Sequence, residues 1–382
     1  MSEINQIKLL VATGLYPPDI GGPATYSRMI EEKLPAHNIV VSIVPFRQVR
    51  YLPKILRHIA YAWILLKQTK NVDCIYALDP VSVGLPALVV SLITRKPFMV
   101  RLGGDYAWEQ GQQRFSLKET LDEYTQNRST APRMVKFLAA VQSFVVQRAW
   151  KIIAPSDYLK SIIETWGVDS SRVEVIYSAL FPLEIHTVKA AIRERLLYSG
   201  TVVATVGRLV PWKGFDELID VIADLRKDIP DIMLVIIGGG PMRKQLNKKI
   251  IDLKLEGRVR MVGKLSKDAL GAAIKGADLF VLNTSYEGFS HQLLEVMDLG
   301  VPIITTRVGG NPELISDGVS GVLVPVHDTS ELSKSIKHLL NNKPLQLRLI
   351  QNARVRTKDF NQDVVVAQFA DILHSELLKK DV

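Results

Sequence analysis

Short runs of β-branched and other apolar residues alternate along this chain with segments of helical periodicity, and the whole alternation occurs twice. The first series begins with residues 7–12 (IKLLVA) and ends with residues 173–177 (VEVIY), and the second begins with residues 201–207 (TVVATVG). Strands that alternate with helices of this length predict right-handed βαβ crossovers and a parallel sheet with helices on both faces. We therefore expect an α/β fold with two doubly wound, Rossmann-like domains.

The length of 382 residues agrees with about two domains, and the 47% hydrophobic residues are enough for packed cores. We place one Rossmann-like domain at residues 1–190 and the other at residues 191–360. A last helix is expected at residues 361–382, and the sequence does not show on which domain it packs.

The single cysteine, Cys74, excludes an intrachain disulfide and a multi-cysteine metal site, as is typical of proteins in a reducing cytoplasm. The first residues lack the basic and apolar regions of a secretory signal, and the longest apolar stretch, residues 81–94, is too short to span a membrane. We expect a cytoplasmic protein. The net charge of +9 predicts anionic partners such as nucleotides, phosphates or an acidic membrane surface.

Ligands of open parallel sheets bind at the carboxyl ends of the strands. Gly21 and Gly22 follow the first strand and precede a helix, so their backbone amides could approach a phosphate, although an ordinary tight turn fits as well. Arg208 and Lys213 follow the first strand of the second domain. Two cations there suit a diphosphate, and a solvated surface pair is the alternative.

Two glutamates follow a later strand. Glu287 lies in the loop after residues 279–283, Ser290 is a candidate N-cap, and Glu295 lies in the helix that ends before Gly300. A carboxylate on a partly buried helix needs donors, which sugar hydroxyls supply. Residues 238–241 (GGGP) lack the third glycine of the dinucleotide fingerprint, and no metal-ligand spacing is present.

The segments GRLVPWKG, GGGP and EGFSHQLLE together resemble the retaining glycosyltransferases of the glycogen-synthase-like group 1 (family 4) with the GT-B fold. PPDIGGPATYS, IAPSDYLK and VGGNPELISDGVSGVLVP extend the resemblance over nearly the whole chain. It implies an N-terminal acceptor-binding domain and a C-terminal domain for a nucleotide-sugar donor, which face a central cleft. It also implies that no metal and no further cofactor take part.

Site residues follow from the resemblance. It implies that Arg208 and Lys213 bind the donor diphosphate and that Gly21 and Gly22 close over it from the other domain. We expect the base to be read by backbone and loop shape around Gly240 and residues 262–264. The resemblance further implies that Glu287 contacts the donor sugar and that Glu295 holds the ribose hydroxyls. The backbone amides of Gly288, Phe289 and Ser290 would bind sugar and phosphate.

One segment departs from the family pattern. Many members carry a histidine where residues 101–109 (RLGGDYAWE) here have Leu102. We expect Asp105 to contact donor or acceptor in its place, with Arg101 or Glu109 as substitutes, and the alternative is a purely structural turn. Ser178 likewise stands where the family commonly has asparagine.

Between Lys33 and Asn71 the chain has basic residues and no acidic one. One helical face collects Leu52, Ile55, Leu56, Ile59, Trp63 and Leu66, and Tyr61 and Trp63 suit a lipid headgroup boundary. This pattern predicts a peripheral membrane contact through residues 47–70, or equally a helix packed on the sheet with a solvated basic face. No nucleic-acid recognition module is evident.

The sequence thus favours retaining, metal-independent transfer of a sugar from a nucleotide sugar to a glycan or lipid-linked acceptor, in cell-surface polysaccharide or glycolipid synthesis. The protein would act in the cytoplasm or on the inner face of the cytoplasmic membrane. The alternatives are a sugar-nucleotide epimerase or phosphorylase of the same fold, and a non-catalytic binding protein.

Overall fold

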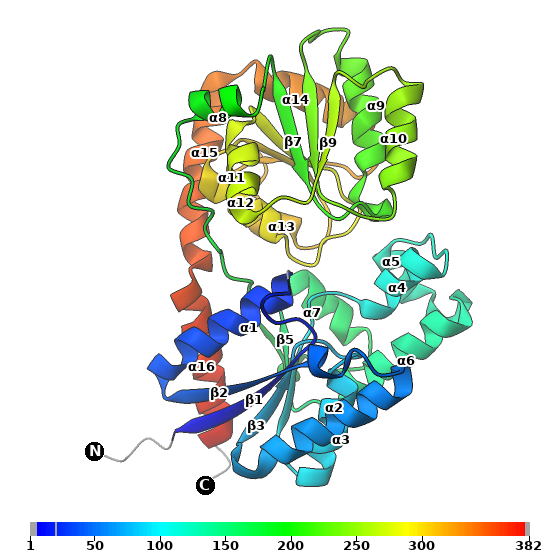
Figure 1. Cartoon of the computed structure of the whole chain (residues 1–382), viewed down its shortest axis with the longest axis vertical. Coiled ribbons are helices and arrows are strands. Elements are labelled where there is room, and N and C mark those ends of the chain that lie inside the picture. The colour runs from blue at the N-terminus through cyan, green and yellow to red at the C-terminus, as the bar shows by residue number, and fades with distance from the viewer. Residues whose placement is uncertain (1–5, 20, 379–382) are drawn as a thin grey trace. The chain divides into compact units, whose positions relative to one another are not determined.

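The computed structural model describes residues 6–19 and 21–378 and divides the chain into two α/β units (Figure 1). The first unit comprises Met1–Ala179 and Phe360–Val382, and the second comprises Leu180–Asp359. The predicted boundary at residue 190 differs from this division by ten residues and falls inside a helix, α8 (Lys189–Arg195).

A six-stranded parallel sheet forms the centre of the first unit, in the order β2-β1-β3-β4-β5-β6. The chain steps from β1 outward to β2 and then returns to the other side of β1, so the β1/β3 junction is the switch point at which α/β sheets bind ligands. The strands are β1 (Ile7–Thr13), β2 (Ile39–Pro45), β3 (Cys74–Ala77), β4 (Phe98–Arg101), β5 (Lys151–Ala154) and β6 (Val173–Val175).

Helices cover both faces of this sheet, as Figure 1 shows. They are α1 (Gly22–Lys33), α2 (Lys54–Gln68), α3 (Gly84–Thr94), α4 (Tyr106–Arg114), α5 (Leu121–Gln126), α6 (Arg133–Arg148), α7 (Asp157–Glu164) and α16 (Gln362–Leu378). Short 3-10 turns link them: η1 (Leu34–His37), η2 (Phe46–Val49), η3 (Thr69–Asn71), η4 (Arg128–Thr130) and η5 (Ser170–Arg172).

The C-terminal helix α16 packs on the first unit, which settles the question that the sequence left open. It contacts α1, and the ring of Phe369 lies 4.9 Å from that of Tyr76 on β3. His374 Nε2 lies 2.8 Å from the carbonyl oxygen of His37. The last segment of the chain therefore completes the core that the first segment begins.

The second unit also has a six-stranded parallel sheet, with the strand order β12-β11-β10-β7-β8-β9. Its switch point lies between β7 and β10. Its strands are β7 (Val202–Val206), β8 (Met233–Ile237), β9 (Val259–Gly263), β10 (Leu279–Leu282), β11 (Ile303–Thr306) and β12 (Val322–Val324). Its helices are α8, η6 (Pro211–Lys213), α9 (Phe215–Leu225), α10 (Arg243–Asp252), α11 (Lys267–Gly276), α12 (His291–Leu299), α13 (Asn311–Leu314), α14 (Thr329–Leu340) and α15 (Lys343–Thr357). The turn η7 (Lys358–Phe360) lies at the boundary to the first unit.

Helix α9 shows why the sequence pattern predicts this core. Its predicted apolar stripe is buried, each member at 1% exposure or less: Phe215, Leu218, Ile219, Ile222 and Leu225. The stripe belongs to one hydrophobic cluster with side chains of β7, β8 and β10. Burial of each such side chain stabilises the fold by about 1.5–3 kcal/mol.

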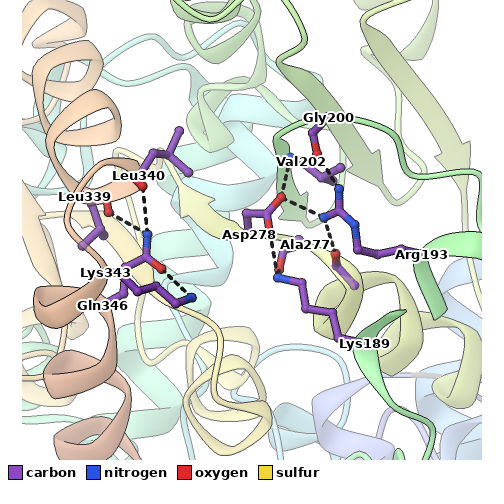
Figure 2. Close-up of polar contacts among 11 residues, drawn as sticks. Lys189, Arg193, Gly200, Val202, Ala277, Asp278, Leu339, Leu340, Lys343 and Gln346 are labelled. Carbon is purple, nitrogen blue, oxygen red and sulfur yellow. Dashed lines mark hydrogen bonds and ion pairs between the residues drawn. The ribbon is translucent and has the colours of Figure 1, made fainter. Parts of the chain in front are cut away.

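Helix α8 lies in a stretch where the sequence predicted no element. Asp278, before β10, anchors it: its carboxylate pairs with Lys189 and Arg193 at 2.8 Å each and accepts a hydrogen bond from the Val202 amide at 2.9 Å (Figure 2). Burial alone would raise the pKa of Asp278, but these donors outweigh it and lower the pKa. Polar contacts rather than a periodic apolar face therefore hold α8.

Candidate donor site and its surroundings

Two loops meet at the switch point of the second sheet. Lys213 lies in η6 after β7, and Glu287 lies in the loop after β10, the neighbouring strand. Their side chains form an ion pair, and each is only 12% exposed. The structure thus brings together two of the residues that the family resemblance assigns to the donor.

Backbone contacts fix both members of this pair. The Trp212 carbonyl oxygen accepts hydrogen bonds from the Thr284 hydroxyl at 2.9 Å and from the Ser285 amide at 2.8 Å. The Gly310 amide donates to the carbonyl oxygen of Glu287 at 3.0 Å. Side chains carried on loops held in this way need little rearrangement to meet developing charge, which is the basis of electrostatic preorganisation. Arg208 shares the first of these loops and is exposed.

Glycines allow these loops to approach one another. Gly214 adopts φ +55°, and a Cβ there would overlap the carbonyl oxygen of Asn283. At Gly240 a Cβ would overlap backbone atoms of Leu209, in the loop that carries Arg208. Gly240 therefore has a packing role that the sequence did not reveal, and its contact with a donor base stays a prediction.

Helix α12 carries the second glutamate. Ser290 is its N-cap, as predicted, and its hydroxyl accepts a hydrogen bond from the Leu293 amide at 3.4 Å. Gly288 and the buried Phe289 precede the cap. Glu295 is partly buried on this helix, and burial raises its pKa to about 7 against a small opposing effect of Lys267.

Within residues 6–19 and 21–378, no three His, Cys, Asp or Glu side chains cluster in a way that could hold a metal ion. Metal-independent chemistry stays a prediction.

In the first unit, Gly21 is the N-cap of α1 and Gly22 is its first residue. Gly21 has φ +150°, a conformation that L side chains rarely adopt. The glycines thus lie after β1 at the switch point of the first sheet, as the sequence predicted for a phosphate-binding turn.

Two arginines of the segment predicted to contact a membrane hold this glycine-rich loop. Arg50 donates to the Gly14 carbonyl oxygen at 2.6 Å and to the Asp19 carboxylate at 3.2 Å, and Arg47 donates to the Pro17 carbonyl oxygen at 2.7 Å. Both follow β2, whose carboxyl end lies beside that of β1. Their position after a strand is the signal that could have identified this role.

Asp105 is fully buried and is the N-cap of α4, where its carboxylate accepts a hydrogen bond from the Trp108 amide at 3.0 Å. Arg128 lies 3.8 Å away, and burial raises the pKa of Asp105. Leu102, at the position of the family histidine, is also fully buried. The structural alternative for Asp105 is thus present, and its contact with donor or acceptor stays a prediction.

Arg101 is engaged in structure as well. It donates to the Ser178 hydroxyl at 3.2 Å and to the Ile176 carbonyl oxygen at 3.3 Å, and its guanidinium lies 4.3 Å from the centre of the Tyr26 ring. The serine that replaces the family asparagine therefore serves as the partner of a buried arginine.

Helix α2 presents its predicted apolar face to solvent, so the alternative in which this face packs on the sheet is wrong. Ile55, Ile59 and Trp63 are 77%, 62% and 57% exposed. Tyr61, expected at a headgroup boundary, is fully buried, and its hydroxyl donates to the Val44 carbonyl oxygen at 2.6 Å. Tyr61 and Leu65 form the side of α2 that packs inward.

Comparisons with known proteins agree with this architecture. A family model for glycosyl transferases group 1 matches residues 191–356, and a model for glycosyltransferase family 4 matches residues 16–180. The chain is 34% identical over 166 residues to the alpha-D-kanosaminyltransferase of Streptomyces kanamyceticus, a match that covers 43% of each protein. It is 31% identical over 229 residues to a D-inositol 3-phosphate glycosyltransferase of Salinispora tropica, covering 55% of this chain and 48% of that protein. The matches thus span about half the length of these relatives.

Solved structures are similar over nearly the whole chain. Anabaena HepE in complex with UDP superimposes with a TM-score of 0.76 at 21% identity, over 97% of this chain and all of that one. WaaG, a glycosyltransferase involved in lipopolysaccharide biosynthesis, superimposes with a TM-score of 0.71 at 16% identity, over 96% of this chain and 99% of that one. These similarities confirm the predicted GT-B fold.

Proposed function

The chain belongs to the group 1, family 4 glycosyltransferases, whose two models match its two halves, and we propose that it transfers a sugar from a nucleotide-sugar donor to a glycan or lipid-linked acceptor. We further propose that the reaction retains the configuration of the sugar, needs neither metal nor cofactor, and serves cell-surface polysaccharide or glycolipid synthesis. The buried Lys213–Glu287 pair at the switch point of the second sheet carries this proposal.

The pair fits the charge changes of such a transfer. As the bond between the sugar and the diphosphate breaks, negative charge grows on the diphosphate, and the cations Arg208 and Lys213 stabilise it there. Glu287 accepts hydrogen bonds from the sugar hydroxyls once the diphosphate provides Lys213 with a second anionic partner. Glu295 binds the ribose hydroxyls in the same way.

In a transfer without a covalent enzyme intermediate, retention requires the acceptor oxygen to attack the sugar carbon from the face on which the diphosphate leaves. The new carbon–oxygen bond forms as the bond to phosphate breaks, and the departing phosphate oxygen takes the acceptor's proton. This step, which the family resemblance implies, asks the protein to position both substrates and to stabilise charge. The residues proposed to do so are Gly21, Gly22, Asp105, Arg208, Lys213, Gly240, Glu287, Gly288, Phe289, Ser290 and Glu295.

The partners follow from the chemistry. HepE is known in complex with UDP-glucose, and the relative LpsE of Rhizobium meliloti is a lipopolysaccharide core biosynthesis glycosyltransferase, so UDP donors and lipid-linked glycans are the first candidates to test. Among the described helices, none is long and apolar enough to cross a membrane. We propose action at the inner face of the cytoplasmic membrane, without nucleic acid.

A thermal-shift panel of UDP, GDP, ADP and dTDP with their sugar conjugates tests the donor site. A ligand at about 100 times its dissociation constant stabilises the fold by roughly 2.7 kcal/mol, and we expect this shift for one base only. Lys213→Ala should abolish it, and Lys334→Ala, whose side chain is 72% exposed on α14, should not. No shift with any nucleotide would contradict the proposal.

Turnover tests the finer claims. With the donor so identified, the anomeric configuration of the product, read by NMR, should match that of the donor, and a chelator should leave the rate unchanged. An inverted product would overturn retention, and loss of activity with the chelator would overturn metal independence. Conversion of the donor into an epimeric nucleotide sugar, without any acceptor, would indicate an epimerase instead.

A further inference from the structure

Three neighbouring helices of the first unit expose large apolar side chains. α2 contacts α3, and α3 contacts α6 (Figure 1). The exposed apolar side chains are Ile55, Leu56, Ile59, Trp63 and Leu66 on α2, Val89, Leu92 and Ile93 on α3, and Met134, Phe137 and Phe144 on α6. We call these eleven side chains the apolar face. Single exposed apolar residues are ordinary, but a large exposed set on three neighbouring helices marks an interaction surface.

Packing of the first unit does not account for this face. The inward side of α2 is formed by the buried Tyr61 and Leu65, and that of α6 by Val135, Val145 and Val146, among others. α3 buries Ala87, Leu88 and Val90. Each helix thus has a complete inward side, and the outward apolar residues are additional.

Charge identifies the occupant. The sequences of α2, α3 and α6 contain no aspartate or glutamate. Exposed cations lie among the apolar residues or at the helix ends: Lys54, Lys67, Arg95, Arg133, Lys136 and Arg148. Two of them lie over exposed rings, with Lys67 Nζ 3.3 Å from the centre of Trp63 and the Arg148 guanidinium 3.8 Å from that of Phe144. Such a surface is complementary to a layer that is anionic outside and apolar beneath.

We propose that the apolar face rests in the headgroup region of an anionic phospholipid bilayer. This extends the contact expected at residues 47–70 to α3 and α6, and it removes Arg47 and Arg50, which hold the glycine-rich loop. A second copy of the chain is a poorer occupant, because a symmetric contact would bring cations against cations with no acidic partner on these helices. The proposal concerns the first unit and does not depend on the donor site.

Sedimentation with vesicles tests the proposal. The full chain is mixed with vesicles of phosphatidylcholine alone and with vesicles in which phosphatidylglycerol makes up about 30% of the lipid. We expect binding to the anionic vesicles, weakened by salt, and little binding to the neutral ones. Equal binding to both, or none to either, would overturn it.

Variants on each helix test its extent. Ile59→Glu on α2, Leu92→Glu on α3 and Phe137→Glu on α6 should each weaken binding to anionic vesicles about fivefold or more, because each removes apolar contact and adds repulsion. Leu347→Glu, at a 57% exposed position on α15 of the second unit, is the matched control and should bind as the parent does.

Two further readouts separate the alternatives. If only Ile59→Glu loses binding, the three-helix surface is overturned. If light scattering shows that the parent is a dimer and that the same variants are monomers, the occupant is a second copy. Hydrogen exchange in β1 and β3 should match that of the parent in all three variants, which shows that the first unit still folds. Vesicle binding without any nucleotide shift would contradict the proposed transferase function and leave this surface supported.

Discussion

Glu295 gives the protein a titrating group near neutral pH, since burial raises its pKa to about 7. In the proposed function its ionised form accepts hydrogen bonds from the ribose hydroxyls, so binding favours loss of the proton. The affinity for a nucleotide sugar should therefore rise about tenfold from about pH 6 to about pH 8. Calorimetric titration with UDP-glucose at both pH values measures this change, and Glu295→Gln should remove it.

The same carboxyl group predicts a slope in stability that does not depend on the ligand. A pKa raised in the folded state means that the native protein holds the proton more tightly than the unfolded chain. The free energy of unfolding should thus fall as pH rises from the ordinary glutamate value of about 4.5 to about 7, and this contribution to the slope should vanish in Glu295→Gln. If stability depends on pH in this way but the affinity for the nucleotide sugar does not, the raised pKa of Glu295 is supported and its contact with the ribose is contradicted.

Variants of Asp105 test whether this residue serves only as a helix cap or also contacts substrate. Asp105→Ala removes the N-cap of α4 and leaves Arg128 without its carboxylate neighbour, so we expect a loss of about 1–3 kcal/mol in the free energy of unfolding by urea. Asp105→Asn keeps an acceptor oxygen and should lose less. If both variants keep their stability and lose transfer activity, Asp105 acts on substrate rather than as a cap.

At the scale of elements, the loop after β8 depends on the absence of a side chain at Gly240. Gly240→Ala would drive a Cβ into the backbone at Leu209, and overpacking of this kind costs about 1–3 kcal/mol. Thermal unfolding should show the loss, together with weaker nucleotide binding. Gly257→Ala, where a Cβ would meet nothing within 4 Å, is the control and should change neither.

The elements that the sequence predicted are those whose signal is local. The apolar stripe of α9 and the Ser290 cap of α12 can be read within a few residues, and both are confirmed. α8 was missed because it buries only Ile192 and is held by Asp278, far along the chain. Periodicity also could not tell which apolar side of α2 packs inward, because the helix has two. Tyr61 and Leu65 form the side that is buried.

In the candidate site, too, local signals were read correctly and long-range contacts were not. Motifs placed Lys213 and Glu287 in loops, and the neighbouring positions of β7 and β10, which no local pattern encodes, bring the two side chains into contact. The contacts of Arg47 and Arg50 with the glycine-rich loop were missed for the related reason that their partners lie 30 or more residues earlier in the chain.

At the scale of the whole molecule, α16 joins the end of the described chain to the first unit. Phe369 is fully buried beside Tyr76, so Phe369→Ala should lower the stability of the first unit by about 3–5 kcal/mol. Hydrogen exchange should accelerate in β1 and β3 and stay unchanged in β7 and β8. Val364→Ala, at a 43% exposed position of the same helix, is the control. Equal acceleration in both units would contradict the assignment of α16 to the first unit.

The return of α16 also sets an order of events on the ribosome. The second unit is one continuous segment, Leu180–Asp359, and all of its residues have been synthesised before α16 is made. The first unit begins earlier in the chain but lacks Phe369 and Leu373, both fully buried, until that helix emerges. The unit translated first is therefore the one completed last, and a released chain that ends at residue 359 should contain a finished second unit and an unfinished first one.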